Sequence, residues 1–515
     1  MQFSSSSIFS DKRVENTVVT IASITVAVAL VKTTLALVKS NDGSEKVPMI
    51  PYKLPFIGST FKYYANPLKF AKTNSEKFGS VFRMHFHGAV TTVVGAKDAP
   101  EIFNNPDLSF LASKNRFFGG SFFESSGKNT LPDKTLKDVV MRHLTTNLND
   151  YSPRAFQQFL QEIDRQALDE QFTVPNLLPF LRRFVSKYSA SAFVGLRMCQ
   201  DEDLISAFEH AVADIGPEFK PGPSRVIFPW FNSFYTKYLF PKSDAVKKHR
   251  ALIKKSLSKE IAKRTSEQLQ DNYIQDKIED NLDYILKKYP HEIDDDHLES
   301  LTTIILIMIF VGVHTTTEAV TYVMYCLVKH PHYIEELRRE QEQVVSNEGI
   351  DYSGSDVIYT PAMYRNMVKL DSFIRECMRT RMVGIVHAHT NISNQDIVLK
   401  SGAIVKPGHE VFINAFHVHH DPENQGDLEN LETFDGFRFV GKDKLAVKSG
   451  HDNVSFGMGK HACSGRWFAI HQIKGIVSYF IKNYNMTPKS EIRIMNSTFG
   501  NYVGRPVGNV QFTKI

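Results

Sequence analysis

The sequence predicts a mainly α-helical protein with a small β region, preceded by an N-terminal transmembrane helix. Residues 17–38 form an apolar run whose only charge is Lys32, and at about 1.5 Å per residue this run is long enough to cross a bilayer. Residues 294–329 lack proline, and their middle, "IILIMIFVGV", is apolar on every side. That pattern predicts one long helix through the centre of the protein. Alternating apolar residues indicate a hairpin in 81–95 and short strands within 391–416.

Three regions are predicted along the chain: a tail and membrane anchor, a proline-rich linker and one catalytic domain, at residues 1–46, 47–59 and 60–515. The anchor helix spans about residues 17–38. A cleaved signal peptide is the alternative, because Lys12 and Arg13 precede the apolar run. No small-residue cleavage site follows the run, however. Lysines after it favour a main body on the cytosolic side.

Composition excludes several classes of protein. The 515 residues are 42% hydrophobic and 23% charged, with a net charge of only +5, which is ordinary for a globular protein and does not suggest a nucleic-acid partner. The four cysteines, Cys199, Cys326, Cys377 and Cys463, are far apart and form no C-x-x-C pair. A disulfide framework or a structural zinc site is therefore not expected, and a reducing compartment fits best.

The stretch "FGMGKHACSG", residues 456–465, places one cysteine among glycines and positive charge. Cys463 lies where this loop enters the last predicted helix, so backbone N–H groups can point at its sulfur and favour a thiolate. Gly457 and Gly459 allow the loop to turn tightly. The alternative is a packed free cysteine near a helix start.

The spacing F-x-x-G-x-x-x-C-x-G resembles the haem-binding loop of cytochrome P-450 enzymes, and it is complete in this sequence. Ser464 replaces the proline that often follows the cysteine. The resemblance implies the cytochrome P-450 fold, with Cys463 as the axial thiolate ligand of haem iron. It also implies haem contacts from neighbouring loop residues, namely Phe456, Gly457, Gly459 and His461.

Two further motifs follow the family's order. An apolar stripe predicts one helix over residues 361–381. Glu376 and Arg379 are three residues apart on this helix, a spacing that alone is most often a surface ion pair. It resembles the family's E-x-x-R, and Arg438, in "FDGFRF", resembles the arginine that completes a structural network beneath the haem. A buried bidentate contact between guanidinium and carboxylate explains why these residue types are needed.

The central helix carries "VGVHTTTEA", residues 311–319, which resembles the family's A-G-x-(D/E)-T-T. The resemblance implies that Gly312 opens space for dioxygen and that Thr315 helps to protonate iron-bound oxygen. Ordinary back-bonding within a helix is the alternative for Thr315. His314 stands where the family has an acid; it could relay protons or simply face solvent-filled space.

Haem propionates need cations or hydrogen-bond donors. His461 is the first candidate by position, and Arg142 and His389 are further candidates by resemblance. The family's W-x-x-x-R is missing around Arg142, and an arginine is usual where His389 stands. A plain surface role is equally open for both residues.

The resemblance implies a membrane-anchored haem-thiolate monooxygenase of fungal type. Such an enzyme inserts one oxygen atom of O2 into a small hydrophobic molecule, here a terpenoid or another specialised metabolite. The implied cofactor is haem b (iron protoporphyrin IX), with electrons from NADPH through a separate cytochrome P-450 reductase and cytochrome b5 as a second candidate donor. The implied location is the endoplasmic reticulum membrane, with the catalytic domain facing the cytosol.

Three alternatives are kept. A haem-thiolate isomerase or dehydratase would work without O2, but the presence of Gly312 and Thr315 argues against it. A haem sensor or redox carrier would need no substrate pocket. In a membrane protein without haem, every motif would be a coincidence. Separately, the aromatic stretch 223–241 could dip into lipid or form a buried loop.

Overall fold

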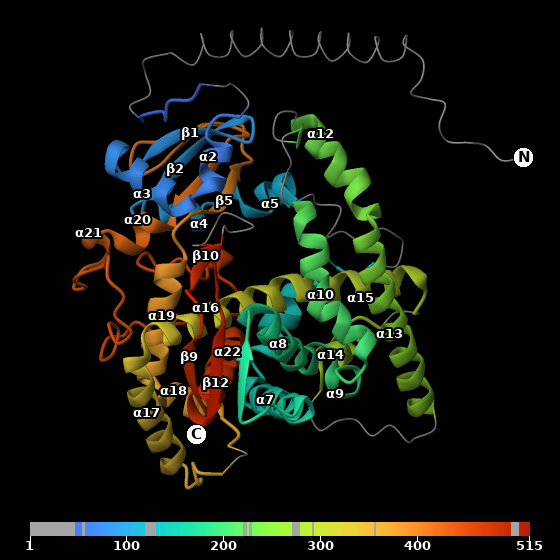
Figure 1. The fold of residues 1–515 in the computed structure, drawn as a ribbon. Helices are drawn as coiled ribbons and strands as arrows, with labels where there is room; N and C mark the ends of the chain where they lie inside the picture. Colours follow the sequence, from blue (N-terminus) through green and yellow to red (C-terminus); the bar gives the residue numbers. More distant parts are fainter. Residues whose placement is uncertain are drawn as a thin grey trace, which may run out of the picture.

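The structure is a computed structural model that describes residues 47–53, 57–118, 130–132, 134–219, 224–225, 229–269, 279–290, 293–354, 357–495 and 504–515. The predicted anchor, and the signal peptide that is its alternative, fall on residues 1–46 and so lie outside the described residues. The described chain is mostly helical with small sheets, as the sequence predicts (Figure 1).

The α-helices of the described residues run from Thr60 to Asn483. They are α2 (Thr60–Ala65), α3 (Pro67–Phe78), α4 (Ala99–Asn104), α5 (Phe110–Phe118), α6 (Thr135–Asp138), α7 (Leu148–Gln166), α8 (Leu177–Phe193), α9 (Gly195–Met198), α10 (Glu202–Phe219), α12 (Pro229–Phe234), α13 (Asp244–Leu269), α14 (Asn281–Lys288), α15 (Asp295–Met308), α16 (Thr315–Lys329), α17 (Ile334–Asn347), α18 (Pro361–Asn366), α19 (Val368–Arg381), α20 (Ala415–His420), α21 (Pro422–Gln425) and α22 (Arg466–Asn483). Within the described ranges, the π-helical turns are η2 (Val139–Leu144), η3 (Tyr235–Leu239) and η5 (Ile309–His314), and the 3₁₀ turns are η4 (Phe240–Lys242), η6 (Pro331–Tyr333) and η7 (Gly459–His461).

The largest sheet has the strand order β1-β2-β8-β5-β3, formed by Phe82–Phe86, Ala89–Val94, Glu410–Asn414, Ile385–Asn391 and Leu108–Ser109. β1 and β2 are the predicted hairpin, and His87 and Gly88 at its turn both have positive φ, as a type I′ turn requires. Residues 48–50 of the predicted linker run beside β1, where the Ile50 N–H donates to Arg83 O at 2.8 Å.

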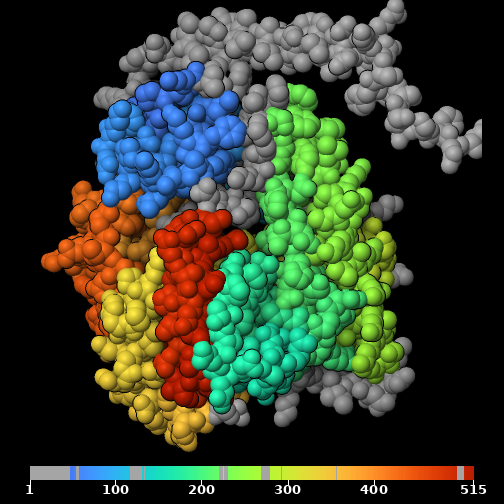
Figure 2. Space-filling view, in the orientation of Figure 1, coloured from blue at the N-terminus to red at the C-terminus, as the bar shows by residue number. Residues whose placement is uncertain are grey.

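Three smaller sheets complete the β structure of the described residues. β4 (Gln171–Val174), β12 (Val510–Lys514) and β9 (Tyr484–Pro488) form a three-stranded antiparallel sheet in the order β4-β12-β9. Figure 2 shows the C-terminal strands, in red, lying against the segment that carries β4, in blue-green. Two pairs complete the set: β10 (Arg493–Met495) with β11 (Arg505–Val507), and β6 (Ile397–Val398) with β7 (Ile404–Val405).

One continuous helical run, α15–η5–α16, crosses the centre of the molecule (Figure 1). It begins where the Asp294 carboxylate accepts from the His297 N–H at 2.8 Å, and it ends at Lys329. These bounds confirm the predicted long helix. Among the described residues this run alone is long and apolar enough to cross a membrane, but more than half of it is buried in the protein, as expected of a core helix.

The prediction of one helix over residues 361–381 is wrong in one respect, because α18 and α19 are separate. Met367 leaves the helical region with ψ 74°. Glu340 of α17 then caps the new helix start, accepting from the Lys369 N–H at 2.6 Å and the Leu370 N–H at 2.9 Å. A carboxylate from another helix satisfies amides that a continuous helix would have bonded internally.

Close packing of α22 against α7 and α18 yields a test of this core. A Cβ at Gly475 would lie 2.5 Å from Tyr364 Oη and 2.9 Å from Phe156 Cδ2, so Gly475→Ala should lower the free energy of unfolding by about 1–3 kcal/mol. Gly216 of α10 is the matched control, since its Cβ would have no closer neighbour than Val212 Cγ1 at 3.9 Å. The measurement is the urea midpoint of unfolding, which should be lower in Gly475→Ala than in Gly216→Ala. Equal midpoints in the two variants would contradict the close packing at Gly475.

Candidate active site

The loop that carries Cys463 is held in shape by its own backbone. The Cys463 N–H donates to Phe456 O at 2.7 Å, and the Gly457 N–H donates to Val454 O at 3.0 Å. Gly457 and Gly459 have φ of 69° and 58°, a left-handed conformation that disfavours other residues. A Cβ at Gly459 would also lie 2.6 Å from Asn104 Oδ1. The glycines are therefore required by the turn and by the approach of α4.

Cys463 differs from the other cysteines because its side chain is accessible, whereas Cys199, Cys326 and Cys377 are buried. Protein nevertheless surrounds most of its sulfur, and this burial raises the pKa of the Cys463 thiol. The N–H groups of Gly465 and Arg466, together with the Arg466 charge, act in the opposite direction and favour the thiolate. A metal cation at the sulfur would complete the shift toward the thiolate form.

Glu376, Arg379 and Arg438 form a buried network, as their resemblance to the family's motif suggests. The Glu376 carboxylate accepts from Arg379 Nε at 2.7 Å and Nη2 at 2.8 Å, and from Arg438 Nε at 3.2 Å. These side chains are 0%, 3% and 5% exposed respectively. Arg438 also donates to the backbone carbonyls of Glu429, Asn430 and Thr433. The Glu376–Arg379 pair is therefore buried, and the surface ion pair that the i, i+3 spacing also allowed is excluded.

His419 connects this network to the cysteine loop, and sequence reasoning missed it. Arg379 Nη1 donates to His419 O at 3.1 Å, and the His419 ring accepts from the Val454 N–H at 3.2 Å through Nε2. Its Nδ1 faces Met382 O at 3.1 Å and so carries the proton. Burial lowers the pKa of His419 to about 3, which keeps the acceptor nitrogen free. No spacing in the sequence marks this contact, since it depends on the path of residues 415–454.

The central helix presents an open strip in its middle. Val311 is 54% exposed, although Phe310 and Val313 beside it are buried. Thr315, one turn later, is exposed as well, and its hydroxyl donates to Val311 O at 2.7 Å. Thr315 therefore makes the hydrogen bond to its own helix that was the alternative interpretation, and its hydroxyl oxygen can still accept a hydrogen bond from a further partner.

Gly312 lies on a different side of the helix from this strip. A Cβ there would come within 2.9 Å of Phe193 Cζ at the end of α8. The Phe193 ring in turn lies 6.0 Å from the ring of Phe468, in the first turn of α22. Gly312 therefore permits close packing that joins the central helix to the helix which Cys463 precedes.

His389 and His461 come together although 72 residues separate them in the sequence. Their ring centroids are 5.4 Å apart, and the Phe110 ring lies within 5.8 Å of His389 and 6.4 Å of His461. Burial lowers the pKa of His389 to about 4. Its Nδ1 bonds His387 O at 2.7 Å, whereas its buried Nε2 has no hydrogen-bond partner in the part of the chain that the structure describes.

Positive charge gathers around His461. Burial lowers its pKa, and the charges of Lys137 and Lys460 lower it further. Neither lysine has an acidic partner among the described residues. Arg142 is 71% exposed and lies 3.5 Å from Asp138 Oδ1, so no described contact joins it to His389 or His461.

Comparison of the sequence with known proteins shows which family the chain belongs to. The cytochrome P-450 family profile matches residues 48–512. The chain belongs to the cytochrome P-450 family. Cytochrome P-450 monooxygenase 103 of Postia placenta is 26% identical over 90% of this chain and 93% of its own length. Cytochrome P-450 monooxygenase hepE of Aspergillus oryzae is 27% identical over 84% and 81%. These matches confirm the family and enzyme class, haem-thiolate monooxygenase, predicted from the sequence.

A solved cytochrome P-450 structure supports the fold alone. Retinoic acid-bound cyanobacterial CYP120A1 has a TM-score of 0.64 to this chain at 20% sequence identity, covering 92% of this chain and all of that one. The predicted cytochrome P-450 fold is thereby confirmed for the described residues.

The residues present could hold the family's haem. An accessible thiol beside helix-start amides, the orphaned nitrogen of His389 and the open apolar side chains of Phe110 and Val311 suit a flat apolar group with an iron atom and carboxylates. Phe110 is 40% exposed and Val311 is 54% exposed, so both offer apolar surface to a bound group.

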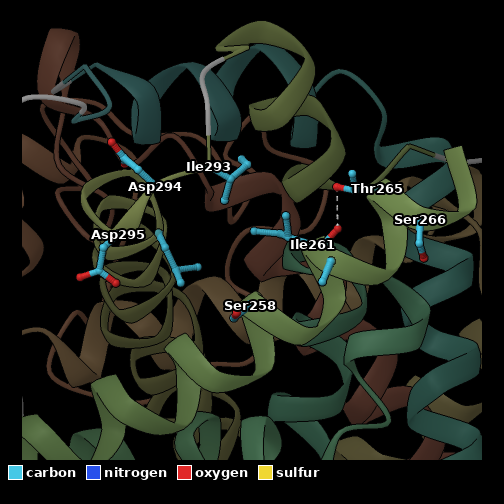
Figure 3. Close-up of a pocket in the computed structure, with 9 residues that line it drawn as sticks. Ser258, Ile261, Thr265, Ser266, Ile293, Asp294 and Asp295 are labelled. Atoms are coloured by element: carbon cyan, nitrogen blue, oxygen red, sulfur yellow. Dashed lines mark hydrogen bonds between the residues drawn. The ribbon is translucent and has the colours of Figure 1, made fainter. Parts of the chain in front are cut away.

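A separate hollow of about 720 Å³ lies between α13 and the start of α15 (Figure 3). Asp294 and Asp295 border it on one side, and Ile261 and Thr265 of α13 border it on the other. The Thr265 hydroxyl donates to Ile261 O at 3.0 Å, so it is satisfied within its own helix. None of the predicted site residues lines this hollow.

Removing Arg438 tests the network. Arg438→Ala removes one donor from the buried Glu376 carboxylate and one from each of three backbone carbonyls, so we expect a loss of about 3–5 kcal/mol in the free energy of unfolding. Haem bound per polypeptide should fall with it, because the network positions the cysteine loop. Arg493→Ala is the control, since Arg493 and its partner Glu491 are 75% and 76% exposed. A wild-type urea midpoint and haem content for Arg438→Ala would refute this role.

Proposed function

We propose that this protein is a membrane-anchored haem-thiolate monooxygenase that inserts one atom of O2 into a small hydrophobic molecule. The observation that carries the proposal is the accessible Cys463 thiol at the start of α22, with the N–H groups of Gly465 and Arg466 directed at it. The Cys463 sulfur would hold the iron of haem b, and the bound haem would supply the oxygen chemistry.

The haem propionates are proposed to meet His389 and His461. A carboxylate beside His389 would raise the pKa of that imidazole and supply the missing partner for Nε2. Lys137 and Lys460 place positive charge nearby. Arg142 is exposed, and we propose that it contributes to the surface around the haem edge rather than to a buried contact.

Thr315 is proposed to orient the proton donor at the oxygen-binding side. The Thr315 hydroxyl donates a hydrogen bond to Val311 O, so its lone pairs can accept from water or from a bound group. When this back-bond opens, the hydroxyl can donate to another partner instead. The exposed strip of Val311 and Thr315 offers an apolar surface with one hydroxyl. Such a surface positions a hydrophobic substrate and keeps bulk water low.

Electrons are proposed to arrive from NADPH through a separate reductase, with cytochrome b5 as an additional donor. Exposed basic residues lie on α6, η2 and η7 and just before α6, namely Lys137, Arg142, Lys460 and Lys134. They would attract an acidic partner surface to the side of the protein nearest the thiolate.

The protein is proposed to sit on the endoplasmic reticulum membrane with its catalytic body in the cytosol. The proposed organisation keeps the anchor within residues 1–46, the linker at 47–59 and the catalytic domain at 60–515. Four large side chains on α12 and η3 are 45% to 65% exposed, namely Trp230, Phe234, Tyr238 and Leu239. They form an apolar patch of the kind that enters the lipid interface. α12 lies at the same end of the molecule as the β1–β2 hairpin (Figure 1).

The proposed substrate is a terpenoid or another specialised metabolite. The open apolar side chains Phe110, Leu111 and Val311 favour a hydrophobic ligand, and the similar proteins come from fungi. Expression with a reductase, followed by profiling of new metabolites, identifies the substrate.

Cys463→Ala tests the ligand. Without the thiolate, the purified protein should lose both the absorption band that reduced thiolate-ligated haem gives with carbon monoxide and all oxygenated product. Cys326→Ala removes a buried thiol outside the loop and should retain the band. Oxidation that persists in Cys463→Ala would defeat the assignment.

Thr315→Ala tests proton delivery against the reaction without O2. We expect NADPH consumption to continue while product per NADPH falls by about tenfold or more, with peroxide released instead. Thr317→Ala is the matched control, because Thr317 makes the same back-bond, to Val313 O at 2.7 Å, from a buried position. Product formation that needs neither O2 nor NADPH would instead favour the isomerase or dehydratase.

A further inference from the structure

Three titratable residues follow one another on the central helix at intervals of four: His314, Glu318 and Tyr322. Residues at this spacing lie on one side of a helix, one turn apart. The series starts beside Thr315 and continues away from it along α16. A carboxylate therefore stands one turn beyond the imidazole, in the helix that carries the open strip.

Glu318 is held from outside its own helix by two arginines. Its Oε2 lies 3.3 Å from Nη2 of Arg381, the last residue of α19. Its Oε1 accepts from Arg505 Nε at 3.0 Å, and Arg505 belongs to β11, which packs on α16. The Glu318 side chain is 17% exposed. Burial would raise its pKa, but the charges of Arg381 and Arg505 outweigh burial, so the pKa of Glu318 is lowered and the group stays ionised.

Four charged groups among the described residues act on the pKa of His314, and they come from four different elements. Glu318 lies on its own helical run, Arg381 on α19, Arg505 on β11 and Arg182 on α8. Burial lowers the pKa of His314 to about 4, and the three guanidinium groups add to this, whereas Glu318 alone acts to raise it. His314 is therefore neutral near pH 7, and Glu318 is the group that eases its protonation.

We propose that Glu318 is a positioning residue for proton transfer: clamped by Arg381 and Arg505, its carboxylate stabilises the imidazolium form of His314 one turn away. The family motif has an acid at position 314, next to the threonine. In this chain the imidazole occupies that place, and the carboxylate lies one turn later. An ionised acid that stabilises a transient imidazolium without taking the proton is an established arrangement in enzymes.

The proton step balances without any further reactant. A hydronium ion of the solvent gives a proton to one ring nitrogen of His314 and becomes water, and the other ring nitrogen releases a proton to the Thr315 hydroxyl. That hydroxyl passes its own proton to the reacting group, and the imidazole returns to its neutral form. Glu318 remains a carboxylate throughout. This role rests on the proposed function, since only oxygen chemistry at the haem needs a supply of protons here.

The test measures His314 protonation directly in the full-length holoenzyme. Carbon monoxide on reduced haem serves as the probe, because its infrared C–O stretching frequency responds to nearby charge. In the wild type we expect one frequency from about pH 5.5 to 8, since His314 stays neutral over this range. Arg505→Gln removes one positive charge, so a pH-dependent second band should appear in this range. The band should be absent from the double variant Arg505→Gln/His314→Gln.

Glu318 is then tested in that background. Adding Glu318→Gln to Arg505→Gln should lower the midpoint of the second band by about one pH unit, a tenfold change in the acid dissociation constant of His314. Adding Glu318→Asp instead keeps the charge and should leave the midpoint within about 0.3 pH units of that in Arg505→Gln. A merely structural role for Glu318 would not move this midpoint.

Two results would overturn the proposal: an unchanged midpoint on adding Glu318→Gln, or no His314-dependent band in Arg505→Gln. If Arg505→Gln does not fold, Arg182→Gln replaces it, because Arg182 also disfavours protonation of His314. A protein that binds no haem would show no carbon monoxide signal in any variant. That outcome contradicts the proposed function itself and is therefore distinguishable from failure of the Glu318 proposal.

Discussion

The rest of the site depends on the hydrogen bonds that the buried Glu376 carboxylate accepts from Arg379 and Arg438. The two arginines also donate to backbone carbonyls between residues 419 and 433. Residues 426–433 have no helix or strand, so their carbonyls find donors on buried guanidinium groups rather than in a ladder. Through His419 the same network reaches Val454 and fixes the start of the cysteine loop. Breaking one partner leaves several polar groups unpaired at once, which is why such a network tolerates little change.

The cysteine loop depends on tight turns, whereas the central helix is a continuous helical run. The loop is a chain of tight turns in which glycine conformations allow the Cys463 N–H to return to Phe456 O. The helix is continuous and buried except for the strip at Val311 and Thr315. Phe193 packs between them, against Gly312 and Phe468. The Cys463 thiol and the Thr315 hydroxyl thus sit on separate supports, and these are held together by direct packing of α16 on α22 as well as by Phe193.

The sequence predicts the parts of this site that depend on local spacing. The glycines and Cys463, the Glu376–Arg379 pair and the long helix all follow from short motifs or from hydrophobic pattern. His419 and Glu318 could not be predicted in the same way, because their partners come from distant segments such as Val454 and Arg505. The break at Met367 was missed for a similar reason: the groups that cap α19 belong to Glu340 of another helix. The anchor at residues 17–38 remains a prediction.

The central claim is that the sulfur of Cys463 is bonded to haem iron. Iron K-edge X-ray absorption of the purified resting protein measures this most directly, because it counts the atoms in the first shell around iron by element. We predict one sulfur scatterer in that shell together with the porphyrin nitrogens, and its loss in a protein that lacks Cys463. A first shell made only of nitrogen and oxygen atoms in the wild-type protein would contradict the account.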